Sequence, residues 1–340
     1  MYPQTQKHIV KMMAEQVMPG ANVGFIKDGE RVITTLGHAQ IIPTCEPLTP
    51  SHLYDVASLT KVIGTTTLIL QLWEDGKLDI SKPLHDYYPA FENQDITILE
   101  LLTHTSDVQA YIENRDQLSA EELKAALLRL KPGSEQGHKV AYTDTGSLLL
   151  GFYLEEVYQK PIQTLITERV LKPLAMSHST FKPNSEHAIA PTENHPTRGV
   201  IKGQVHDPKA FKLKENCGSA GLFSTIDDCL LFAETLLNNG TAPDGHQLLK
   251  PDTVERLISD WTTNTSHPRS LGWDLLPGRT ANSPLLFHTG YTGTFMIIDV
   301  SQQEAFVFLS NRVHPVDHRQ AYIDERNKLL EIYLSEKKNS

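Results

Sequence analysis

Runs of apolar and β-branched residues at both ends of the chain predict β-strands. Residues 21–27 and 31–39 are two such runs on either side of an Asp28-Gly29 turn, which is the pattern of a β-hairpin. Near the C-terminus three further runs follow one another as a meander, at residues 285–290, 294–300 and 304–309. Apolar residues at helical spacing predict one helix before the first strand, over residues 6–17, and one after the last strand, from residue 317 to about residue 337.

The middle of the chain follows the helical period instead. Apolar positions recur every three or four residues in four segments, at residues 68–73, 98–102, 121–130 and 146–158. Two more helices are predicted at residues 227–238 and 251–261. Residues 175–213 are rich in Pro, His, Asn and Thr and have little periodicity, so we expect a long irregular crossing there.

Together these elements predict an α+β fold. The two ends of the chain would form one antiparallel sheet flanked by the N- and C-terminal helices, with a mainly helical subdomain inserted between them. We assign residues 1–60 and 215–340 to the sheet domain, and residues 61–214 to the helical subdomain with its irregular crossing. The cleft between the two domains is the expected place for an active site.

Composition and charge narrow the classes of partner. The 340 residues carry a net charge of −10, the isoelectric point is near 5.8, and no basic run with interleaved aromatics occurs. We therefore expect a small-molecule or peptide substrate and no nucleic acid. The sequence has no apolar stretch long enough to span a membrane, and its N-terminus lacks the features of a secretory signal. The chain as given is expected to be cytoplasmic, although a signal or anchor removed earlier would leave no trace in it.

Ser58 and Lys61 form a Ser-x-x-Lys motif at the start of an apolar helical run. The run extends to Trp73, so both residues should lie in the first turn of a buried amphipathic helix, on one face. A serine hydroxyl needs a nearby base to become a good nucleophile, and a desolvated lysine can act as that base. Alternatively, Ser58 merely caps the helix and Lys61 is a solvated surface residue, which this motif alone does not exclude.

Two further motifs lie downstream. Tyr142-Thr143-Asp144 precedes an apolar helix, and in isolation a buried tyrosine before an Asp-capped helix is the favoured interpretation. His288-Thr289-Gly290-Tyr291-Thr292 ends a predicted strand with small residues that let a ligand approach the backbone. A loop with two glycines, Gly290 and Gly293, explains that second motif equally well.

In this order the three motifs resemble the Ser-x-x-Lys, Tyr-x-Asn and Lys/His-Thr-Gly motifs of the serine β-lactamase and penicillin-binding protein superfamily, in its class C β-lactamase-like branch. Other similar stretches are residues 101–106, 170–176, 220–225 and 271–273, and residues 205–207 and 311–315 resemble a bacterial subgroup of serine hydrolases, esterases and penicillin-binding-related proteins. The resemblance covers about residues 23–312 and implies a β-lactamase/transpeptidase-like fold.

The resemblance also implies roles for residues that match the motifs. Ser58 would be the acylated nucleophile, Lys61 would share in taking its proton, and Tyr142 would be the general base or proton shuttle. The backbone N–H groups of Ser58 and Tyr291 would form the oxyanion hole. Substrate would meet the remaining motif residues, which are Asp144, His288, Thr289, Gly290, Tyr291 and Thr292.

Two departures from the family pattern bear on the substrate. Asp144 replaces the usual Asn, so an amide donor becomes a carboxylate that only accepts hydrogen bonds when ionised; it could instead hold Lys61. His288 replaces the lysine of most penicillin-binding proteins, and a histidine with an unperturbed pKa is mostly neutral at neutral pH. A neutral His288 would bind a substrate carboxylate more weakly than a lysine, so efficient β-lactamase activity is not expected.

The main hypothesis is a serine hydrolase that acts through an acyl-enzyme on a small ester or on a D-amino-acid or peptidoglycan-derived amide. The closest alternative is a penicillin-binding D-alanyl-D-alanine carboxypeptidase or weak β-lactamase, for which β-lactams would be acylating ligands. A catalytically idle ligand-binding sensor is an alternative of another class. No cofactor or nucleotide is expected, and no metal, although His314 and His318 are four residues apart.

Overall fold

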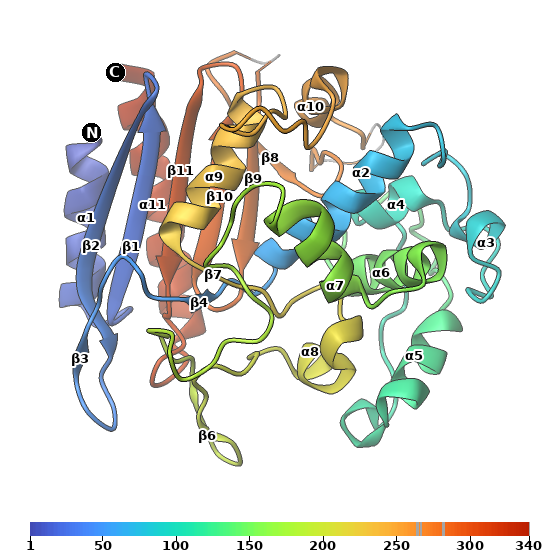
Figure 1. The fold of residues 1–340 in the computed structure, drawn as a ribbon, viewed down its shortest axis with the longest axis horizontal. Helices are drawn as coiled ribbons and strands as arrows, with labels where there is room; N and C mark the ends of the chain where they lie inside the picture. The colour runs from blue at the N-terminus through green and yellow to red at the C-terminus, as the bar shows by residue number, and fades with distance from the viewer. Residues whose placement is uncertain (263–264, 266, 281–282, 340) are drawn as a thin grey trace.

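The two ends of the chain meet in one antiparallel sheet, as the pattern of strands predicts (Figure 1). The computed structural model describes residues 1–262, 265, 267–280 and 283–339. Seven strands lie in the order β3-β2-β1-β11-β10-β9-β8, and their bounds are β1 Gly20–Lys27, β2 Glu30–Gln40, β3 Glu46–Pro47, β8 Asp274–Leu276, β9 Leu285–Gly290, β10 Thr294–Asp299 and β11 Glu304–Ser310. The N-terminal hairpin joins the C-terminal meander where β1 pairs with β11, with Ala21 opposite Ser310.

The hairpin turn at Asp28-Gly29 is confirmed. Lys27 pairs with Glu30, so the loop has two residues, and both have positive φ, 54° at Asp28 and 77° at Gly29. Two positive φ values define the turn whose twist matches that of the flanking strands. Strands β3 and β8 were not predicted, because segments of two and three residues are too short to show an alternating pattern.

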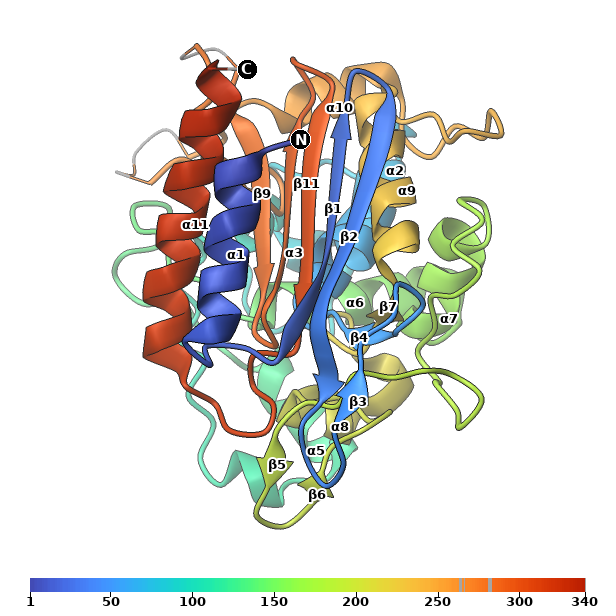
Figure 2. The ribbon, with the colours of Figure 1, turned by 90° about the vertical axis from the view of Figure 1, so that its left-hand side faces the viewer.

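Helices cover both faces of this sheet. Helix α1, Pro3–Ala14, and helix α11, Arg319–Asn339, lie side by side on one face (Figure 2), and α9, Ile226–Leu237, packs on β1, β10 and β11 from the other. The period of two in β11 separates the two cores: Phe306 and Phe308 pack with α1 and α11, whereas Val307 and Leu309 join the main core. The predicted flanking helices are therefore confirmed.

The chain between these strands is mainly helical. Its helices are α2 Thr67–Glu74, α3 Leu84–Tyr87, α4 Ile98–Thr103, α5 Ala120–Leu128, α6 Thr145–Tyr158, α7 Ile162–Ile166, α8 Pro208–Leu213 and, after α9, α10 Pro251–Leu257, with π-helical turns η1 Lys61–Thr66 and η3 Thr167–Leu171 and 3-10 turns η2 Arg115–Gln117 and η4 Lys214–Asn216. Short strand pairs join β4 Tyr54–Asp55 to β7 Phe223–Ser224, and β5 Asn194–His195 to β6 Gly199–Val200. The proposed division at residues 60/61 and 214/215 stays a prediction.

Several predicted details are wrong. The helix after Ser58 is more completely buried than predicted: residues 59–70 are all buried, because η1 and α2 lie in the main core with residues of α6, α7 and α9 around them, and partial exposure begins at Gln71. Helix α1 ends at Ala14 rather than residue 17, and α10 ends at Leu257 rather than residue 261. The irregular crossing ends in a helix, α8, which Asp207 caps by accepting a hydrogen bond from the Ala210 N–H at 2.8 Å.

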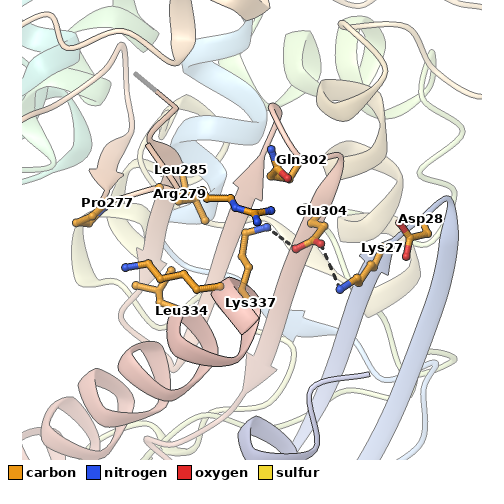
Figure 3. A pocket seen from close by; sticks show the side chains of 11 residues that line it. Lys27, Asp28, Pro277, Arg279, Leu285, Gln302, Glu304, Leu334 and Lys337 are labelled. Atoms are coloured by element: carbon orange, nitrogen blue, oxygen red, sulfur yellow. Dashed lines mark hydrogen bonds and ion pairs between the residues drawn. The ribbon is translucent and has the colours of Figure 1, made fainter. Parts of the chain in front are cut away.

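A small hollow of about 210 Å³ lies at the end of the sheet where β9 begins, and it contains none of the predicted site residues (Figure 3). Glu304 is its central charge. The carboxylate accepts a hydrogen bond from Tyr2 Oη at 2.7 Å and forms ion pairs with Lys337 and Lys27, the latter at 3.6 Å. Lys337 also lies 2.9 Å from Asp299, so this cluster fastens the C-terminal part of α11 to the sheet.

Within the described ranges, no helix combines the length and the apolar character that crossing a lipid bilayer requires.

Candidate active site

Ser58 lies in a tight turn between β4 and η1, and it lines a cleft. Ala57, the residue before it, has a φ of 48°, which is unusual for a residue with a side chain. The buried Asp55 holds this conformation, because its Oδ1 accepts a hydrogen bond from the Ala57 N–H at 2.9 Å. Its Oδ2 accepts another from the His206 N–H at 2.7 Å, so the turn is fixed on both sides.

Lys61 is buried directly beneath Ser58, with 2% of its surface exposed. Its Nζ donates to Ser58 Oγ at 2.7 Å and to the Ser219 carbonyl at 3.0 Å, and lies 2.8 Å from Asp144 Oδ1. Three acceptors match the three donors of an ammonium group. Burial acts to lower the pKa of Lys61, but Asp144 and Tyr142 outweigh it and raise that pKa above its ordinary value. Lys61 is therefore a charged donor, and the alternative of a solvated surface lysine is wrong.

Asp144 stands at the start of α6 but makes no capping hydrogen bond with its side chain. The carboxylate instead bridges two lysines, Lys61 at Oδ1 and Lys209 at Oδ2, the latter at 2.7 Å. Burial raises the pKa of Asp144, but the two ammonium groups outweigh it and hold that pKa well below its usual range. The structure thus brings Asp144 into contact with Lys61, and adds a second lysine that the motifs did not indicate.

Tyr142 lies at the mouth of the cleft and is 49% exposed, so the interpretation as a buried tyrosine is wrong. Lys61 Nζ is 5.4 Å from the centre of the phenol ring. The ring of His104 packs against it with a centroid distance of 4.5 Å. Tyr142 is about eighty residues from Ser58 and Lys61 in the sequence, and the structure brings the three into one cluster.

The turn after β9 is fastened to the backbone that precedes Ser58. Thr292 Oγ1 donates to the Asp55 carbonyl at 2.7 Å, and Thr294 Oγ1 donates to the Val56 carbonyl at 3.0 Å. Thr289, Gly290 and Tyr291 line the same cleft as Ser58, whereas Thr292 is 1% exposed and does not line it. Thr292 therefore supports the turn rather than presenting its side chain to a ligand.

His288 does not line the cleft of Ser58. It is 2% exposed and borders an adjoining hollow with Tyr142, Thr289 and Arg269. Burial, followed by the nearby charges of Lys61 and Arg269, lowers the pKa of His288 well below its ordinary value. A neutral imidazole at this position does not supply the cation that a lysine would.

Residues that the motifs did not identify complete the cleft, which has a volume of about 510 Å³. Helix α11 contributes Arg319, Tyr322, Ile323 and Arg326 to its wall. The motif residue Tyr291 forms another part: its ring stacks on His206 with a centroid distance of 5.5 Å, and its carbonyl accepts from Arg312 Nη2 at 2.6 Å. The volume lies in the range of small-molecule sites, and the α11 wall is cationic.

His314, one of the two histidines four residues apart, is held by backbone groups. His314 is buried, with Nδ1 2.9 Å from the Thr192 carbonyl and Nε2 accepting from the Ile41 N–H at 3.0 Å. Both ring nitrogens of His314 therefore serve the packing of three chain segments.

Comparisons with known proteins identify the family of this chain. The chain matches the model of the family named Beta-lactamase over residues 5–330. A protein of Escherichia coli O157:H7 with the provisional name D-alanyl-D-alanine carboxypeptidase is 31% identical over 352 residues, which cover 87% of this chain and 79% of that protein. An N-acetylmuramyl-L-alanine amidase of Bacillus subtilis (strain 168) is 25% identical over 352 residues, covering 87% and 78% of the two chains.

Solved structures are similar over nearly the whole chain. A class C beta-lactamase has a TM-score of 0.77 and 18% identity, with 97% of this chain and 96% of that chain covered. An octameric penicillin-binding protein homologue from Pyrococcus abyssi has a TM-score of 0.73 and 20% identity, with coverages of 97% and 77%. These likenesses confirm the predicted α+β fold of the β-lactamase/transpeptidase type. Because the family match extends over residues 5–330, the chain belongs to the beta-lactamase family of serine hydrolases.

Proposed function

We propose that this protein hydrolyses a small ester, or a D-amino-acid or peptidoglycan-derived amide, through an acyl-enzyme on Ser58. The observation that carries the proposal is the contact of 2.7 Å between Ser58 Oγ and Lys61 Nζ, at the edge of a cleft that Tyr142 also lines. A positioned serine with proton-transfer partners in a cleft is the arrangement that nucleophilic catalysis requires. An idle ligand-binding sensor has no need of it.

Tyr142 is the proposed proton acceptor. Lys61 is an ammonium group, so its nitrogen has no lone pair for the Ser58 proton. Its three N–H donors are already engaged by Ser58, Ser219 and Asp144. A phenolate at Tyr142 takes that proton as Ser58 Oγ bonds to the substrate carbonyl carbon, and the resulting phenol gives it to the leaving group. Tyr142 then accepts a proton from the water that attacks the acyl carbon. It gives this proton to Ser58 Oγ as the bond between Oγ and the acyl carbon breaks, which releases the acid and restores the Ser58 hydroxyl.

The proposed oxyanion hole consists of the backbone N–H groups of Ser58 and Tyr291. The hydrogen bonds from Thr292 and Thr294 to the backbone before Ser58 support this assignment, because they fix one donor segment relative to the other. Donors of this kind contribute about 10²- to 10³-fold in rate each.

A D-alanyl-D-alanine carboxypeptidase is the second candidate, and the α11 wall of the cleft favours it. Neutral, buried His288 does not replace the lysine that would meet a substrate carboxylate, but Arg319 and Arg326 line the cleft. The name of the Escherichia coli relative gives further support. Weak β-lactamase activity would use the same cations.

One experiment separates these candidates. The protein would be incubated with a short-chain p-nitrophenyl ester, a D-alanyl-D-alanine peptide and a fluorescent penicillin, with acylation followed by intact mass and turnover by absorbance or by released D-alanine. Rapid ester turnover with little stable penicilloyl adduct indicates an esterase-like hydrolase. A long-lived adduct on Ser58 with release of D-alanine indicates the carboxypeptidase. Turnover that survives Ser58→Ala would overturn the acyl-enzyme proposal.

A further inference from the structure

Asp144 is held between two lysines, and only Lys61 belongs to the predicted motifs. Lys209, in the first turn of α8, places its Nζ 2.7 Å from Asp144 Oδ2, while Lys61 Nζ lies 2.8 Å from Oδ1. Lys209 also lies 3.4 Å from Asp207, the residue that caps α8. An unbroken row of alternating charges therefore runs from beneath Ser58 to the start of α8.

The row as a whole has no net charge, because Asp207 supplies a second carboxylate, but next to Lys61 the charge of Asp144 is offset by Lys209. The family motif that the chain resembles has an uncharged amide where Asp144 stands, so its lysine alone sets the local charge. Asp144 adds one negative charge next to Lys61, and Lys209 adds one positive charge that restores the balance. The side chains of Lys61 and Lys209 are only 2% and 18% exposed, so solvent screens this interaction weakly.

The ionisation of the groups is consistent with this balance. Burial lowers the pKa of Lys209, but the carboxylates of Asp144 and Asp207 outweigh it and raise that pKa above its ordinary value. The pKa of Asp144 is held low by both lysines despite its burial. All three side chains are thus charged at neutral pH.

We infer that Lys209 is a positioning residue for the reaction at Ser58. By occupying Oδ2 of Asp144, Lys209 reduces the pull of that carboxylate on Lys61, and the Lys61 ammonium remains bonded to Ser58 Oγ and facing Tyr142. Without Lys209, the Asp144 carboxylate loses its ion pair at Oδ2 and attracts Lys61 more strongly, which draws Lys61 Nζ away from Ser58. The inference rests on the proposed function, because it assigns Lys209 to the same chemical step.

The test is a double-mutant cycle on the rate constant of Ser58 acylation, measured by quenched-flow intact mass with the p-nitrophenyl ester. Lys209→Met is expected to lower this rate constant about 10- to 100-fold and to change KM little, and Lys209→Arg should recover most of the loss by restoring a cation. In an Asp144→Asn background the same Lys209→Met change should alter the rate less than about twofold, because the additional carboxylate is gone.

Lys212→Met is the matched control. Lys212 also lies on α8, but its Nζ donates to the carbonyls of Asp116, at 2.9 Å, and Leu118. The Lys212→Met substitution should therefore change the stability of the protein without changing the rate constant of Ser58 acylation. Equal losses from Lys209→Met in both backgrounds, or no loss in either, would overturn the inference. Acylation of Ser58 with no coupling between Asp144 and Lys209 contradicts this inference alone, whereas turnover by Ser58→Ala contradicts the proposed function itself.

Discussion

Gly290 lies against the carbonyl of Val56, so close that a Cβ on Gly290 would overlap the Val56 oxygen. Val56 is two residues before Ser58, and Tyr291, one proposed oxyanion donor, directly follows Gly290. The approach of these two backbone segments therefore sets the spacing between the proposed donors at Ser58 and Tyr291.

Gly290→Ala should push the two segments apart. We expect acylation of Ser58 to fall about 100-fold, as for the loss of one oxyanion donor, and the free energy of unfolding to fall by about 1–3 kcal/mol. Quenched-flow intact mass and urea unfolding measure the two effects. Gly29→Ala is the control, since Gly29 has a positive φ but open space around it; it should lower stability and leave acylation unchanged.

Tyr142→Phe tests the proposed proton acceptor. Removing the hydroxyl keeps the ring contact with His104 but leaves no group to take the Ser58 proton, so kcat for the ester should fall about 10²- to 10⁴-fold. Tyr142 is half-exposed, and its loss should change the urea midpoint little. If Tyr142→Phe retains most of the kcat, the proton acceptor is another group and the assignment of Tyr142 is wrong.

The sequence predicted those parts of the fold that depend on local pattern. Strands β1, β2, β9, β10 and β11 have six or more residues and show their period, whereas β3 and β8 are too short. The contact between Ser58 and Lys61 follows from a spacing of three at the start of a helix, which places both on one face. The complete burial of residues 59–70 could not be predicted, because it depends on which elements surround them.

The partners of Asp144 show a second limit of prediction from the sequence. Its contact with Lys61 was considered because both stand in motifs, but Lys209 reaches it only because the fold brings the first turn of α8 to the start of α6. The α11 wall had a signal that was not used: Arg319 and Arg326 are seven residues apart, with Tyr322 and Ile323 between them, so they share one face of a predicted helix. Only the structure shows that this face meets the site.

Arg326→Met tests whether the α11 wall meets a substrate carboxylate. Arg326 lines the cleft, and its Nε is buried without a hydrogen-bond partner among the described residues. A charge-assisted hydrogen bond contributes about 1.5–3 kcal/mol, so KM for a D-alanyl-D-alanine peptide should rise about tenfold or more while KM for a neutral ester stays constant. Lys328→Met, which removes an exposed cation of α11, is the control. Equal changes for both substrates would exclude carboxylate recognition by Arg326.

Two buried histidines should make stability depend on pH. Burial is the main cause that lowers the pKa of both His104 and His288 well below the ordinary value near 6.5. Below about pH 6.5 the unfolded chain binds protons that the native state does not, so the free energy of unfolding should fall as the pH is lowered, by up to about 1.4 kcal/mol per pH unit for each histidine. Urea unfolding between pH 7.5 and pH 5 measures this slope. His288→Gln should reduce this slope by up to about 1.4 kcal/mol per pH unit, and an unchanged slope would contradict the assignment.

Glu304→Gln should weaken the attachment of α11 without affecting the chemistry, because the cluster in Figure 3 lies at the opposite end of β9 from the cleft. The substitution removes the charge that pairs with Lys337 and Lys27 but keeps an acceptor for Tyr2. Loss of one partner in a buried ionic cluster leaves the others incompletely compensated, so the free energy of unfolding should fall by about 2–4 kcal/mol with kcat unchanged. Glu331→Gln, on an exposed position of α11, should change neither. A stable Glu304→Gln variant would mean that apolar packing of α11 on the sheet, rather than this cluster, holds the helix in place.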